Sequence, residues 1–382
     1  MTTAPVSSYE KSEWLTPAVR ALPPAGDPQT AGDLAAANIT GLRLLHMNES
    51  PYPPSPRAVE AAMTTVKNDL HRYPAARGQP LADAIAKRIG VTPKRIVIGD
   101  GSGELILFTV AVAMTAGGNA VGPAPTFPNY ANATRVFGGS VVRTRLDAQG
   151  APDARALLAA MNDKTRIVYC CTPNPPSGGM MSADAIRLLA AGVPDNVFLV
   201  IDEAYVEFAM FDGGPDLLPI LSKRAGPWVS LRTFSKAYSL AGLRVGYAIC
   251  GSDEVFEAYR RSMVAFNVSN VGLNAAYAAL HDDEHLQRTL TAVVRERRRL
   301  SDGMATLGLK PMPSHANFVS ALWPQTAGPA IAELRRRGIM ARDWRDPDHM
   351  REIRITVGTP EDTDAVLQAL AEMLEQHRLT QA

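Results

Sequence analysis

Lys236 is the residue whose type and setting most strongly suggest chemistry in this chain. It follows the apolar run 228–232 through Thr233-Phe-Ser235, and a further apolar stretch comes after it. A surface lysine whose stem covers apolar groups is the ordinary explanation of such a position. An amine in a poorly solvated site, however, has its charged form disfavoured and can attack carbonyl carbons. Lys236 is therefore a candidate nucleophile.

Polar side chains also follow three other apolar runs. Asp202 and Tyr205 come after residues 197–201, and Asn174 comes after residues 166–171 in a turn rich in proline. A buried Asp202 carboxylate would need a cation beside it, unless it only caps a helix. After residues 95–98, the small residues that lead to Ser102-Gly103-Glu104 either form an ordinary turn or open a helix whose N–H groups hold an anion.

These segments need a scaffold that brings them together. Seven short runs rich in β-branched residues alternate with helical stretches before residue 250, and they predict one large α/β lobe with a mostly parallel seven-stranded sheet flanked by helices. The runs are residues 95–98, 120–122, 141–146, 166–171, 197–201, 228–232 and 245–250. Ligands of such sheets bind at the carboxyl ends of the strands, so the polar segments should meet at one edge.

The chain is expected to divide into an N-terminal arm (1–40), a large domain (41–275) and a small C-terminal domain (276–382). The small domain has an α+β pattern. It begins with a long helix that carries the basic run 295–299, and its last helix follows a capping box, Thr359-Pro-Glu-Asp362. Its expected strands are residues 317–322, 339–342 and 352–357.

Two helices are expected early in the large domain, one of them over residues 81–89. The other follows Ser55-Pro56, which has the pattern of an N-cap and a first-turn proline. Apolar residues at helical spacing mark one face of that helix, namely Val59, Met63, Val66 and Leu70.

Composition excludes several classes of protein. Of the 382 residues, 46% are hydrophobic and 20% charged, and the net charge of +1 provides no basic field for nucleic acid. The longest apolar run, 105–116, is too short to span a bilayer. The segment 1–24 lacks the apolar core of a secretory signal. Cys170, Cys171 and Cys250 lack metal-ligand spacing, and the adjacent pair would point to opposite faces of a strand. We therefore expect no disulfide, no metal site and a cytoplasmic location.

The candidate groups fit one ligand, pyridoxal 5′-phosphate. Its aldehyde requires a lysine, and its pyridine nitrogen requires a carboxylate that keeps the nitrogen protonated. Its 3′-oxygen needs hydrogen-bond donors, and its phosphate needs backbone amides, hydroxyl groups and an arginine. The polar segments described above supply the lysine, the carboxylate, a phenol, an amide and the backbone amides of a helix start.

Three motifs resemble those of the class I and II aminotransferases of fold type I, and most closely their histidinol-phosphate aminotransferase branch. They are Asn174-Pro-Pro-Ser-Gly, Asp202-Glu-Ala-Tyr205 and the segment from Ser235-Lys236 to Arg244-Val-Gly. The resemblance covers nearly the whole chain, from Asn48-Glu-Ser-Pro-Tyr52 to Arg354-Ile-Thr-Val-Gly-Thr359. The segment around Lys236 is the most specific part of it.

The resemblance implies a role for each residue of the cofactor site. Lys236 would form a Schiff base with the cofactor and carry a proton to and from the substrate α-carbon. Asp202 would pair with the ring nitrogen, and Tyr205 and Asn174 would hydrogen-bond the 3′-oxygen. Phe127 would stack on the ring, unless it only packs in the core. The phosphate would be held by Ser102, Gly103, Glu104, Thr233, Ser235, Arg244 and, from a neighbouring subunit, Tyr73. The last residue implies a homodimer with shared active sites.

The resemblance also implies substrate contacts. Arg354 would grip the anionic end of the substrate through a bidentate fork, and Arg342 would be a second anion contact or else a solvated residue at a strand end. Tyr52 and Asn48 resemble residues of the N-terminal segment that closes over the substrate. Two residues depart from the pattern of the histidinol-phosphate enzymes: Phe127 replaces the usual tyrosine, and Ser50 replaces an asparagine.

The expected function is that of a pyridoxal-phosphate-dependent aminotransferase that works on an amino donor and a 2-oxo acid by a two-stage ping-pong cycle. Within it, histidinol-phosphate:2-oxoglutarate aminotransferase, an enzyme of histidine biosynthesis, is the leading interpretation. An aromatic amino acid aminotransferase is the first alternative, and a threonine-phosphate decarboxylase is the second. A regulator with a retained aminotransferase domain is the third, but the roughly 40 residues before the first motif leave too little room for a winged helix.

Overall fold

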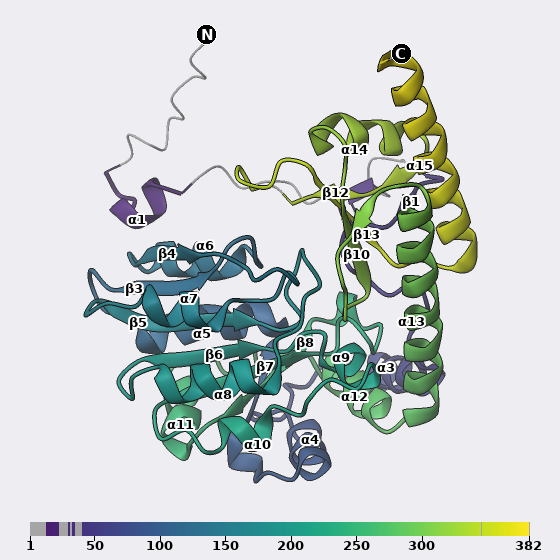
Figure 1. The fold of residues 1–382 in the computed structure, drawn as a ribbon. Coiled ribbons are helices and arrows are strands. Elements are labelled where there is room, and N and C mark those ends of the chain that lie inside the picture. The colour runs from purple at the N-terminus through teal and green to yellow at the C-terminus, as the bar shows by residue number, and fades with distance from the viewer. Residues whose placement is uncertain (1–12, 23–29, 31–32, 35–39, 345, 382) are drawn as a thin grey trace.

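A computed structural model describes residues 13–22, 30, 33–34, 40–344 and 346–381 of the chain (Figure 1). A large lobe and a smaller lobe lie side by side, and the long helix α13 (Asp283–Thr306) packs against both. Of the expected N-terminal arm, the described part includes the short helix α1 (Pro17–Arg20), which lies near α6 (Asn129–Val136). The other residues of the arm lie outside the described ranges.

A seven-stranded sheet forms the centre of the large lobe, as predicted. Its strands lie in the order β2-β8-β7-β6-β5-β3-β4. Strand β8 is antiparallel to both of its neighbours, and all other neighbouring pairs are parallel. Every strand except β8 therefore ends at the same edge of the sheet. The strands are β2 (Ile96–Asp100), β3 (Asn119–Pro123), β4 (Ser140–Thr144), β5 (Thr165–Cys171), β6 (Phe198–Asp202), β7 (Trp228–Thr233) and β8 (Val245–Cys250).

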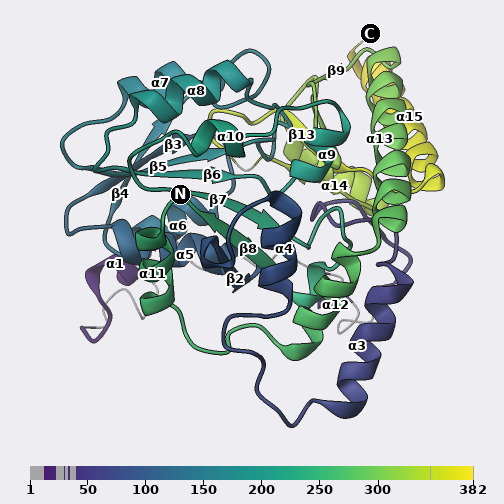
Figure 2. The ribbon, with the colours of Figure 1, turned by 90° about the horizontal axis from the view of Figure 1, so that it is seen from below.

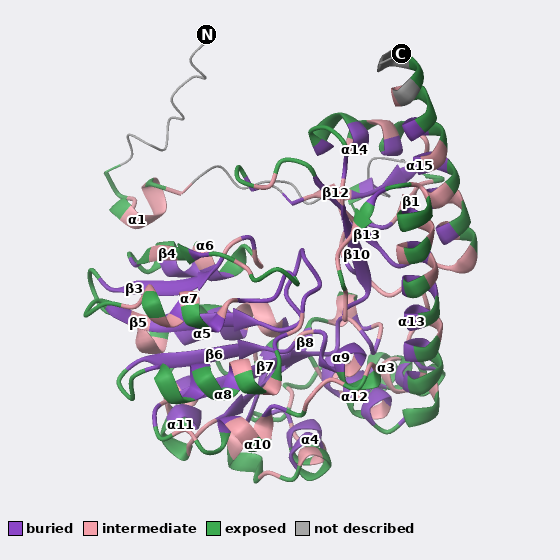
Figure 3. Ribbon diagram, viewed as in Figure 1, coloured by how far each residue is buried: buried purple, intermediate pink, exposed green. Residues whose placement is uncertain are grey.

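Helices cover both faces of this sheet (Figure 2). One face carries α5 (Gly101–Ala113), α6 and α11 (Asp253–Ser262), and the other carries α7 (Ala154–Ala159), α8 (Ala183–Gly192) and α10 (Leu218–Leu221). The central strands are buried on both faces, which is why they read as continuous apolar runs (Figure 3). Cys170 and Cys171 pack into different core clusters, as the alternation of a strand requires. All three cysteines are buried and free.

Further helices complete the large lobe. They are α3 (Pro56–Asn68), α4 (Leu81–Ile89), α9 (Val206–Phe211) and α12 (Asn270–Leu280), with short 3-10 turns at η2 (Pro93–Arg95) and η3 (Ala241–Leu243). Helix α3 begins where the sequence predicts, but the Ser55 hydroxyl bonds the Asp282 carboxylate and does not cap the helix. The apolar stripe of α3 is not part of the core of its own chain, because its members are 43–66% exposed: Val59, Met63, Val66 and Leu70.

The small lobe is an antiparallel sheet in the order β12-β13-β10-β9, with α13, α14 (Ala327–Arg336) and α15 (Pro360–Gln381) packed around it. Its strands are β9 (Lys310–Pro311), β10 (Phe318–Leu322), β12 (Arg342–Asp343) and β13 (Glu352–Thr356). The capping box at the start of α15 is present, since the Thr359 N–H donates to Asp362 Oδ2 (2.9 Å) and the Asp362 N–H donates to Thr359 Oγ1 (3.3 Å).

One expected strand is divided in two. Residues 339–342 form β11 (Ile339–Met340) and the beginning of β12, because β11 turns away from the sheet to pair with β1 (Arg43–Leu44). Arg43 and Leu44, which we expected in the large domain, thus lie with the small lobe. The other domain boundaries stay predictions. Among the described residues, no helix is both long and apolar enough to cross a membrane.

Candidate active site

The polar segments that follow β2, β5, β6 and β7 meet at one edge of the central sheet. Backbone hydrogen bonds tie them to one another: the Thr172 N–H donates to the Asp202 carbonyl (2.9 Å), the Glu203 N–H to the Leu231 carbonyl (2.8 Å), and the Gly101 N–H to the Arg244 carbonyl (3.1 Å). The expectation that these segments share one edge is therefore confirmed.

Lys236 lies in the loop after β7 and points toward the N-terminal segment of the chain. Its Nζ donates a hydrogen bond to the Met47 carbonyl (3.2 Å). Burial lowers the pKa of Lys236 to about 8, and the positive charge of Arg354 acts in the same direction. An amine with such a pKa is neutral in a sizeable fraction of molecules near neutral pH, which a nucleophile toward an aldehyde requires.

Asp202 is the last residue of β6 and is buried. Its Oδ2 accepts a hydrogen bond from the Tyr130 hydroxyl (2.7 Å), and its Oδ1 accepts one from the Ala204 N–H (3.0 Å). Burial raises the pKa of Asp202 to about 6, while the Tyr130 hydroxyl acts to lower it. Tyr205, not Asp202, occupies the N-cap position of α9, so capping of a helix does not explain the carboxylate. A buried carboxylate held in this way suits a cationic partner.

Tyr205 presents a buried phenol beside the same edge. Its oxygen accepts a hydrogen bond from Asn48 Nδ2 (2.9 Å), and its ring packs edge-on against Phe318 at 5.5 Å between centroids. Asn48 is itself buried, and Thr356 Oγ1 donates to its Oδ1 (3.2 Å). The side chain of Asn48 therefore bonds to both lobes.

Asn174 is fully buried in the loop after β5. Its Nδ2 donates to the Pro125 carbonyl (3.1 Å) and to Ser177 Oγ (2.9 Å), and its Oδ1 accepts from Thr126 Oγ1 (2.7 Å). Both amide hydrogens are thus bonded within the protein. One of these two bonds must be replaced if Asn174 is to donate to a ligand.

An anion cradle lies where β2 passes into α5. Gly101 has φ +67, and a Cβ at this position would collide with the guanidinium of Arg244. Only glycine therefore allows Arg244 to lie beside the first turn of α5, where Ser102 and Gly103 present N–H groups. The positive charge of the guanidinium and the helix N-terminus both favour an anion at this position.

Hydroxyl groups from the end of β7 and from the loop after it complete the cradle. Thr233 Oγ1 donates to Ser235 Oγ (2.9 Å), and Arg244 Nη1 lies 3.5 Å from the same Ser235 oxygen. Glu104 stabilises the turn, because its Oε2 accepts one hydrogen bond from the Asp100 N–H (2.7 Å) and one from Asn267 Nδ2 (2.6 Å). The carboxylate of Glu104 thus orders the loop that holds the anion.

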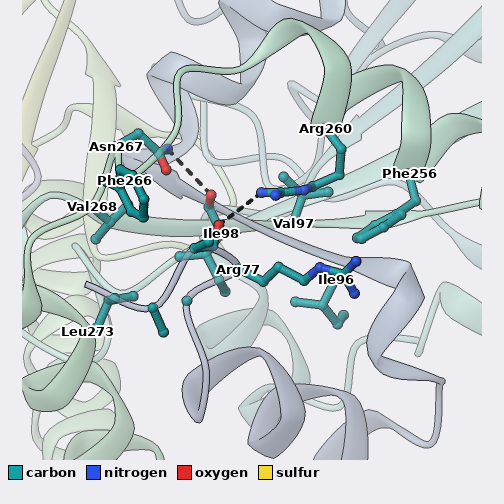
Figure 4. Close-up of a pocket in the computed structure, with 13 residues that line it drawn as sticks. Arg77, Ile96, Val97, Ile98, Phe256, Arg260, Phe266, Asn267, Val268 and Leu273 are labelled. Atoms are coloured by element: carbon teal, nitrogen blue, oxygen red, sulfur yellow. Dashed lines mark hydrogen bonds between the residues drawn. The ribbon is translucent and has the colours of Figure 1, made fainter. Parts of the chain in front are cut away.

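A small pocket lies behind this turn (Figure 4). Arg260 Nη1 donates to the Ala76 carbonyl (3.0 Å), and Asn267 Nδ2 lies 3.5 Å from the Ile98 carbonyl. Its volume of about 20 Å³ has room for a water molecule but not for a cofactor. The pocket lies among the residues that pack against β2 and is not a cofactor site.

Phe127 and Tyr73 occupy very different settings. Phe127 is half-buried beside the site, and its ring meets that of Tyr130 edge-on at 5.8 Å. Tyr73 is 83% exposed, and its ring stacks on Phe266 at 5.0 Å. A phenol so open to solvent is free to meet another molecule.

The two arginines of the expected substrate site face each other in the small lobe. Arg342 of β12 and Arg354 of β13 are directly opposite in the antiparallel register. Arg354 Nη2 donates to the His46 carbonyl (2.5 Å), and its guanidinium lies 5.6 Å from the centre of the Phe318 ring. Like charges directly opposite each other on neighbouring strands repel, and an anion between them would relieve the repulsion.

Tyr52 is the last of the expected substrate contacts. It is half-buried against the core of the large lobe. Burial raises its pKa, and the negative charge of Glu296 acts in the same direction. Tyr52 is therefore a neutral phenol over the physiological range.

Comparison with known proteins identifies the family. A sequence profile described as Aminotransferase class I and II matches residues 41–370. The chain belongs to this family. Histidinol-phosphate aminotransferase 2 of Pseudomonas aeruginosa is 37% identical to this aminotransferase over 330 residues, which are 86% of this chain and 88% of that protein. The aromatic amino acid aminotransferase of Cutibacterium acnes is 34% identical over 334 residues, 87% of this chain and 92% of that protein.

Solved structures agree with this assignment. The histidinol-phosphate aminotransferase of Sinorhizobium meliloti, solved in complex with pyridoxal-5′-phosphate, superposes with a TM-score of 0.87 at 28% identity and covers 95% of this chain and 98% of its own. The aspartate aminotransferase of Thermus thermophilus with maleate has a TM-score of 0.81 at 21% identity, with coverage of 94% and 99%, and shows the shared fold. The expectation of a fold-type I aminotransferase is confirmed.

The residues at the sheet edge fit the cofactor on which this family depends. They comprise an amine of lowered pKa, a buried carboxylate, a phenol and an anion cradle that only glycine leaves open. This aminotransferase is therefore pyridoxal-phosphate-dependent. Within the described ranges, no group of three or more His, Cys, Asp or Glu side chains is placed to hold a metal ion.

Some contributors to the site were not predicted. Tyr130 lies in the same segment as Phe127, but nothing in its spacing indicates that its hydroxyl reaches Asp202. Thr126 and Ser177 hold Asn174, and Thr356 and Asn317 hold Asn48. The sequence could have indicated these residues only because they are polar and lie next to recognisable motifs. It could not indicate which residues they bond, because several of those partners lie far away in the chain.

Proposed function

We propose that this enzyme transfers the amino group of histidinol phosphate to 2-oxoglutarate. The observation that carries this assignment is the pair Arg342 and Arg354, which face each other across β12 and β13. Two arginines at opposed positions of neighbouring strands suit a phosphate dianion better than a neutral side chain. Relatives that are named histidinol-phosphate aminotransferase and are 32–37% identical to this chain support the same choice.

Bound pyridoxal phosphate supplies an aldehyde that condenses with amines and a ring that withdraws electrons. The chain's own residues supply the binding and the proton transfers. With the cofactor bound, Asp202 would hold a proton on the ring nitrogen, and Tyr205 would donate a hydrogen bond to the 3′-oxygen. The free amine of Lys236, no longer bonded to the cofactor, would accept the proton of the substrate α-carbon and deliver it to the cofactor side, a transfer that its lowered pKa of about 8 favours. Ser102, Gly103, Thr233, Ser235 and Arg244 hold the phosphate.

Arg354 serves both halves of the ping-pong cycle. In one half it receives the phosphate of histidinol phosphate, and in the other it receives a carboxylate of glutamate or 2-oxoglutarate, since both are compact oxyanions that accept a bidentate pair of hydrogen bonds. Arg342 adds a second contact that only a substrate with a bulky anion uses. Tyr52 closes the site from the N-terminal segment.

The alternative function is that of an aromatic amino acid aminotransferase. A relative with this name is 34% identical over most of the chain, and Phe127 replaces the tyrosine that is usual in histidinol-phosphate enzymes. An aromatic substrate would not use the anion contact that we propose for Arg342, so we place this assignment second.

A substrate panel tests the proposal. The purified enzyme, loaded with pyridoxal phosphate, is given histidinol phosphate, phenylalanine, tyrosine or phosphothreonine, each with 2-oxoglutarate, and glutamate formation is measured. We expect the highest kcat/KM with histidinol phosphate. Preference for phenylalanine or tyrosine would support the alternative, and carbon dioxide release from phosphothreonine without 2-oxoglutarate would contradict both.

We also propose that the enzyme is a homodimer in the cytoplasm and acts in histidine biosynthesis. The exposed apolar residues on and after α3 support the dimer, since water-exposed apolar stripes of this kind mark association surfaces. The 83% exposure of Tyr73 supports a role in the site of a second subunit. Light scattering should give twice the mass of 41.0 kDa, and a monomer that is fully active would contradict the shared site.

A further inference from the structure

Asn48 is bonded through its side chain and backbone to three other residues. Its N–H donates to Thr356 Oγ1 (3.0 Å), its Oδ1 accepts from the same hydroxyl (3.2 Å), and its Nδ2 donates to Tyr205 Oη (2.9 Å). Asn317 Nδ2 donates to its carbonyl (2.9 Å). The side chain is also buried, with 3% of the residue exposed. A residue so enclosed is poorly placed to contact the substrate directly.

We propose that Asn48 is a positioning residue that holds the Tyr205 hydroxyl in the orientation in which it donates to the 3′-oxygen of the cofactor. The inference rests on the role that we propose for Tyr205. It also revises the expectation that Asn48 binds the substrate. The direction of the hydrogen bond between the two side chains decides whether the Tyr205 hydroxyl can donate to the cofactor.

The neighbours of Asn48 fix that direction. Its backbone N–H can only donate, so Thr356 Oγ1 accepts from it and keeps one proton to give. That proton goes to Asn48 Oδ1, which leaves the NH₂ group to face Tyr205. The Tyr205 oxygen therefore accepts, and its own proton remains available for a ligand atom. With the amide reversed, Tyr205 would donate to Asn48 instead.

The backbone of Asn48 is suited to this task. Its φ of +54 lies in the left-handed region, which asparagine tolerates better than most residues. Bonds from Thr356 on β13 and from Asn317 beside β10 hold the residue in this conformation. The same segment supplies the Met47 carbonyl to Lys236 and the His46 carbonyl to Arg354. Asn48 thus lies at the centre of the segment that borders both the lysine and the arginine.

The network joins the substrate side of the site to the cofactor side. Thr356 and Arg354 lie two residues apart on β13 and so share one face of the sheet. The centre of the Phe318 ring lies 5.6 Å from Arg354 Cζ and 5.5 Å from the centre of the Tyr205 ring. Asn48 and Phe318 therefore both lie between β13 and Tyr205. Besides the neutral amide of Asn48, the ionisable groups that act on Tyr205 are Arg354, Cys171 and Asp202.

The test uses the pH-dependent absorbance of the enzyme loaded with pyridoxal phosphate and does not rely on turnover. A hydrogen bond to the deprotonated 3′-oxygen stabilises the deprotonated form, so loss of the bond raises the midpoint of the transition. The variants are Asn48→Gly, which keeps the positive φ, Tyr205→Phe, and the double variant. Since a hydrogen bond contributes about 0.5–1.5 kcal/mol, Asn48→Gly should raise the midpoint by roughly 0.5–1 pH unit. In the double variant, Asn48→Gly should not raise the midpoint beyond the value of Tyr205→Phe alone.

Two further variants separate positioning from a structural effect. Thr356→Val keeps the shape of the side chain but removes the hydroxyl that orients Asn48, so it should raise the midpoint in the same direction even if Asn48→Gly folds poorly. Asn317→Ala removes a bond to the Asn48 backbone but leaves both side-chain bonds of Asn48 in place, so it should shift the midpoint less than Asn48→Gly does.

The possible outcomes are distinct. A shift with Tyr205→Phe but none with Asn48→Gly and Thr356→Val would overturn the role of Asn48 and leave that of Tyr205 intact. No shift with Tyr205→Phe would overturn both roles. A shift with Asn48→Gly that persists in the Tyr205→Phe background, or an equal shift with Asn317→Ala, would show that Asn48 acts by another route.

Discussion

The Tyr130 hydroxyl donates a 2.7 Å hydrogen bond to the carboxylate of Asp202, although the two residues are 72 positions apart in the sequence. Tyr130 lies in α6 and Asp202 at the end of β6, and both are buried. Burial raises the pKa of Asp202 to about 6, and the Tyr130 bond counteracts that rise. Tyr130 therefore helps to keep Asp202 ionised for a cationic ring nitrogen.

The affinity for the cofactor should fall as the pH is lowered, and replacing Tyr130 with phenylalanine should raise the midpoint of that fall. Asp202 pairs with a cation only when it is ionised, so affinity should fall as the pH drops through about 6. A hydrogen bond to a charged group is worth about 1.5–3 kcal/mol, so Tyr130→Phe should raise that midpoint by about 1–2 pH units. Fluorescence titration of the apoenzyme with pyridoxal phosphate across pH measures it. Tyr169→Phe, which alters the ring stacked on Tyr130, is the control, and an equal shift there would count against the explanation.

Lys236 should react with the cofactor aldehyde in proportion to its neutral fraction. Because its pKa is lowered to about 8, the rate of cofactor attachment should rise with pH and level off above about 8, whereas an ordinary lysine would continue to gain up to about 10. Stopped-flow absorbance of apoenzyme mixed with pyridoxal phosphate gives this profile. Lys236→Ala should lose the visible band and any peptide adduct after borohydride reduction. An adduct that is retained at another lysine would show that a different amine is used.

Gly101→Ala should damage the phosphate cradle. The added Cβ would collide with the Arg244 guanidinium and would also strain a backbone with φ +67. Gly117→Ala is a matched control, because Gly117 has φ +72 but open space around it. Both variants should lose about 1 kcal/mol of stability from backbone strain, while only Gly101→Ala should also weaken pyridoxal phosphate binding, by roughly tenfold or more. Equal affinities in the two variants would contradict the cradle.

The facing arginines should differ in their effect on different substrates. Arg354→Ala should reduce kcat/KM for histidinol phosphate and for glutamate, since both use the same guanidinium. Arg342→Ala should reduce kcat/KM for histidinol phosphate by about 10- to 100-fold, with a much smaller loss for glutamate, because hydrogen bonds to charged groups contribute about 1.5–3 kcal/mol. Steady-state kinetics with each substrate decide the matter. Turnover of histidinol phosphate that Arg354→Ala leaves unchanged would remove the proposed substrate site.

Mixed dimers should reveal whether Tyr73 works in the partner's site. Lys236→Ala and Tyr73→Ala variants should each be impaired as homodimers. A heterodimer of the two has one site with both native residues if Tyr73 comes from the other subunit. Equal mixing after mild dissociation should therefore restore about a quarter of the wild-type activity. If activity stays at the average of the two parents, Tyr73 does not complete a site across the interface.

The sequence by itself determined the parts of this protein that depend on local pattern. Short runs rich in β-branched residues marked all seven strands of the large sheet, and those of the central strands are almost continuously apolar because strands buried on both faces need apolar residues at nearly every position. The residues after those runs marked the site, because parallel strands bring their carboxyl ends to one edge. Lys236, Asp202 and Tyr205 could be located in this way without any contact being known.

Only the tertiary structure decided which side chains meet. The bond from Asn48 to Tyr205 spans 157 positions, and the antiparallel register alone places Arg342 opposite Arg354. Residues 339–342 are divided between two sheets because Ile339 and Met340 pair with β1, which is distant in the sequence. The apolar stripe on α3 has the pattern of a core face, yet it is exposed in the single chain. An apolar pattern predicts that a surface is buried, but it does not identify the element or molecule that buries it.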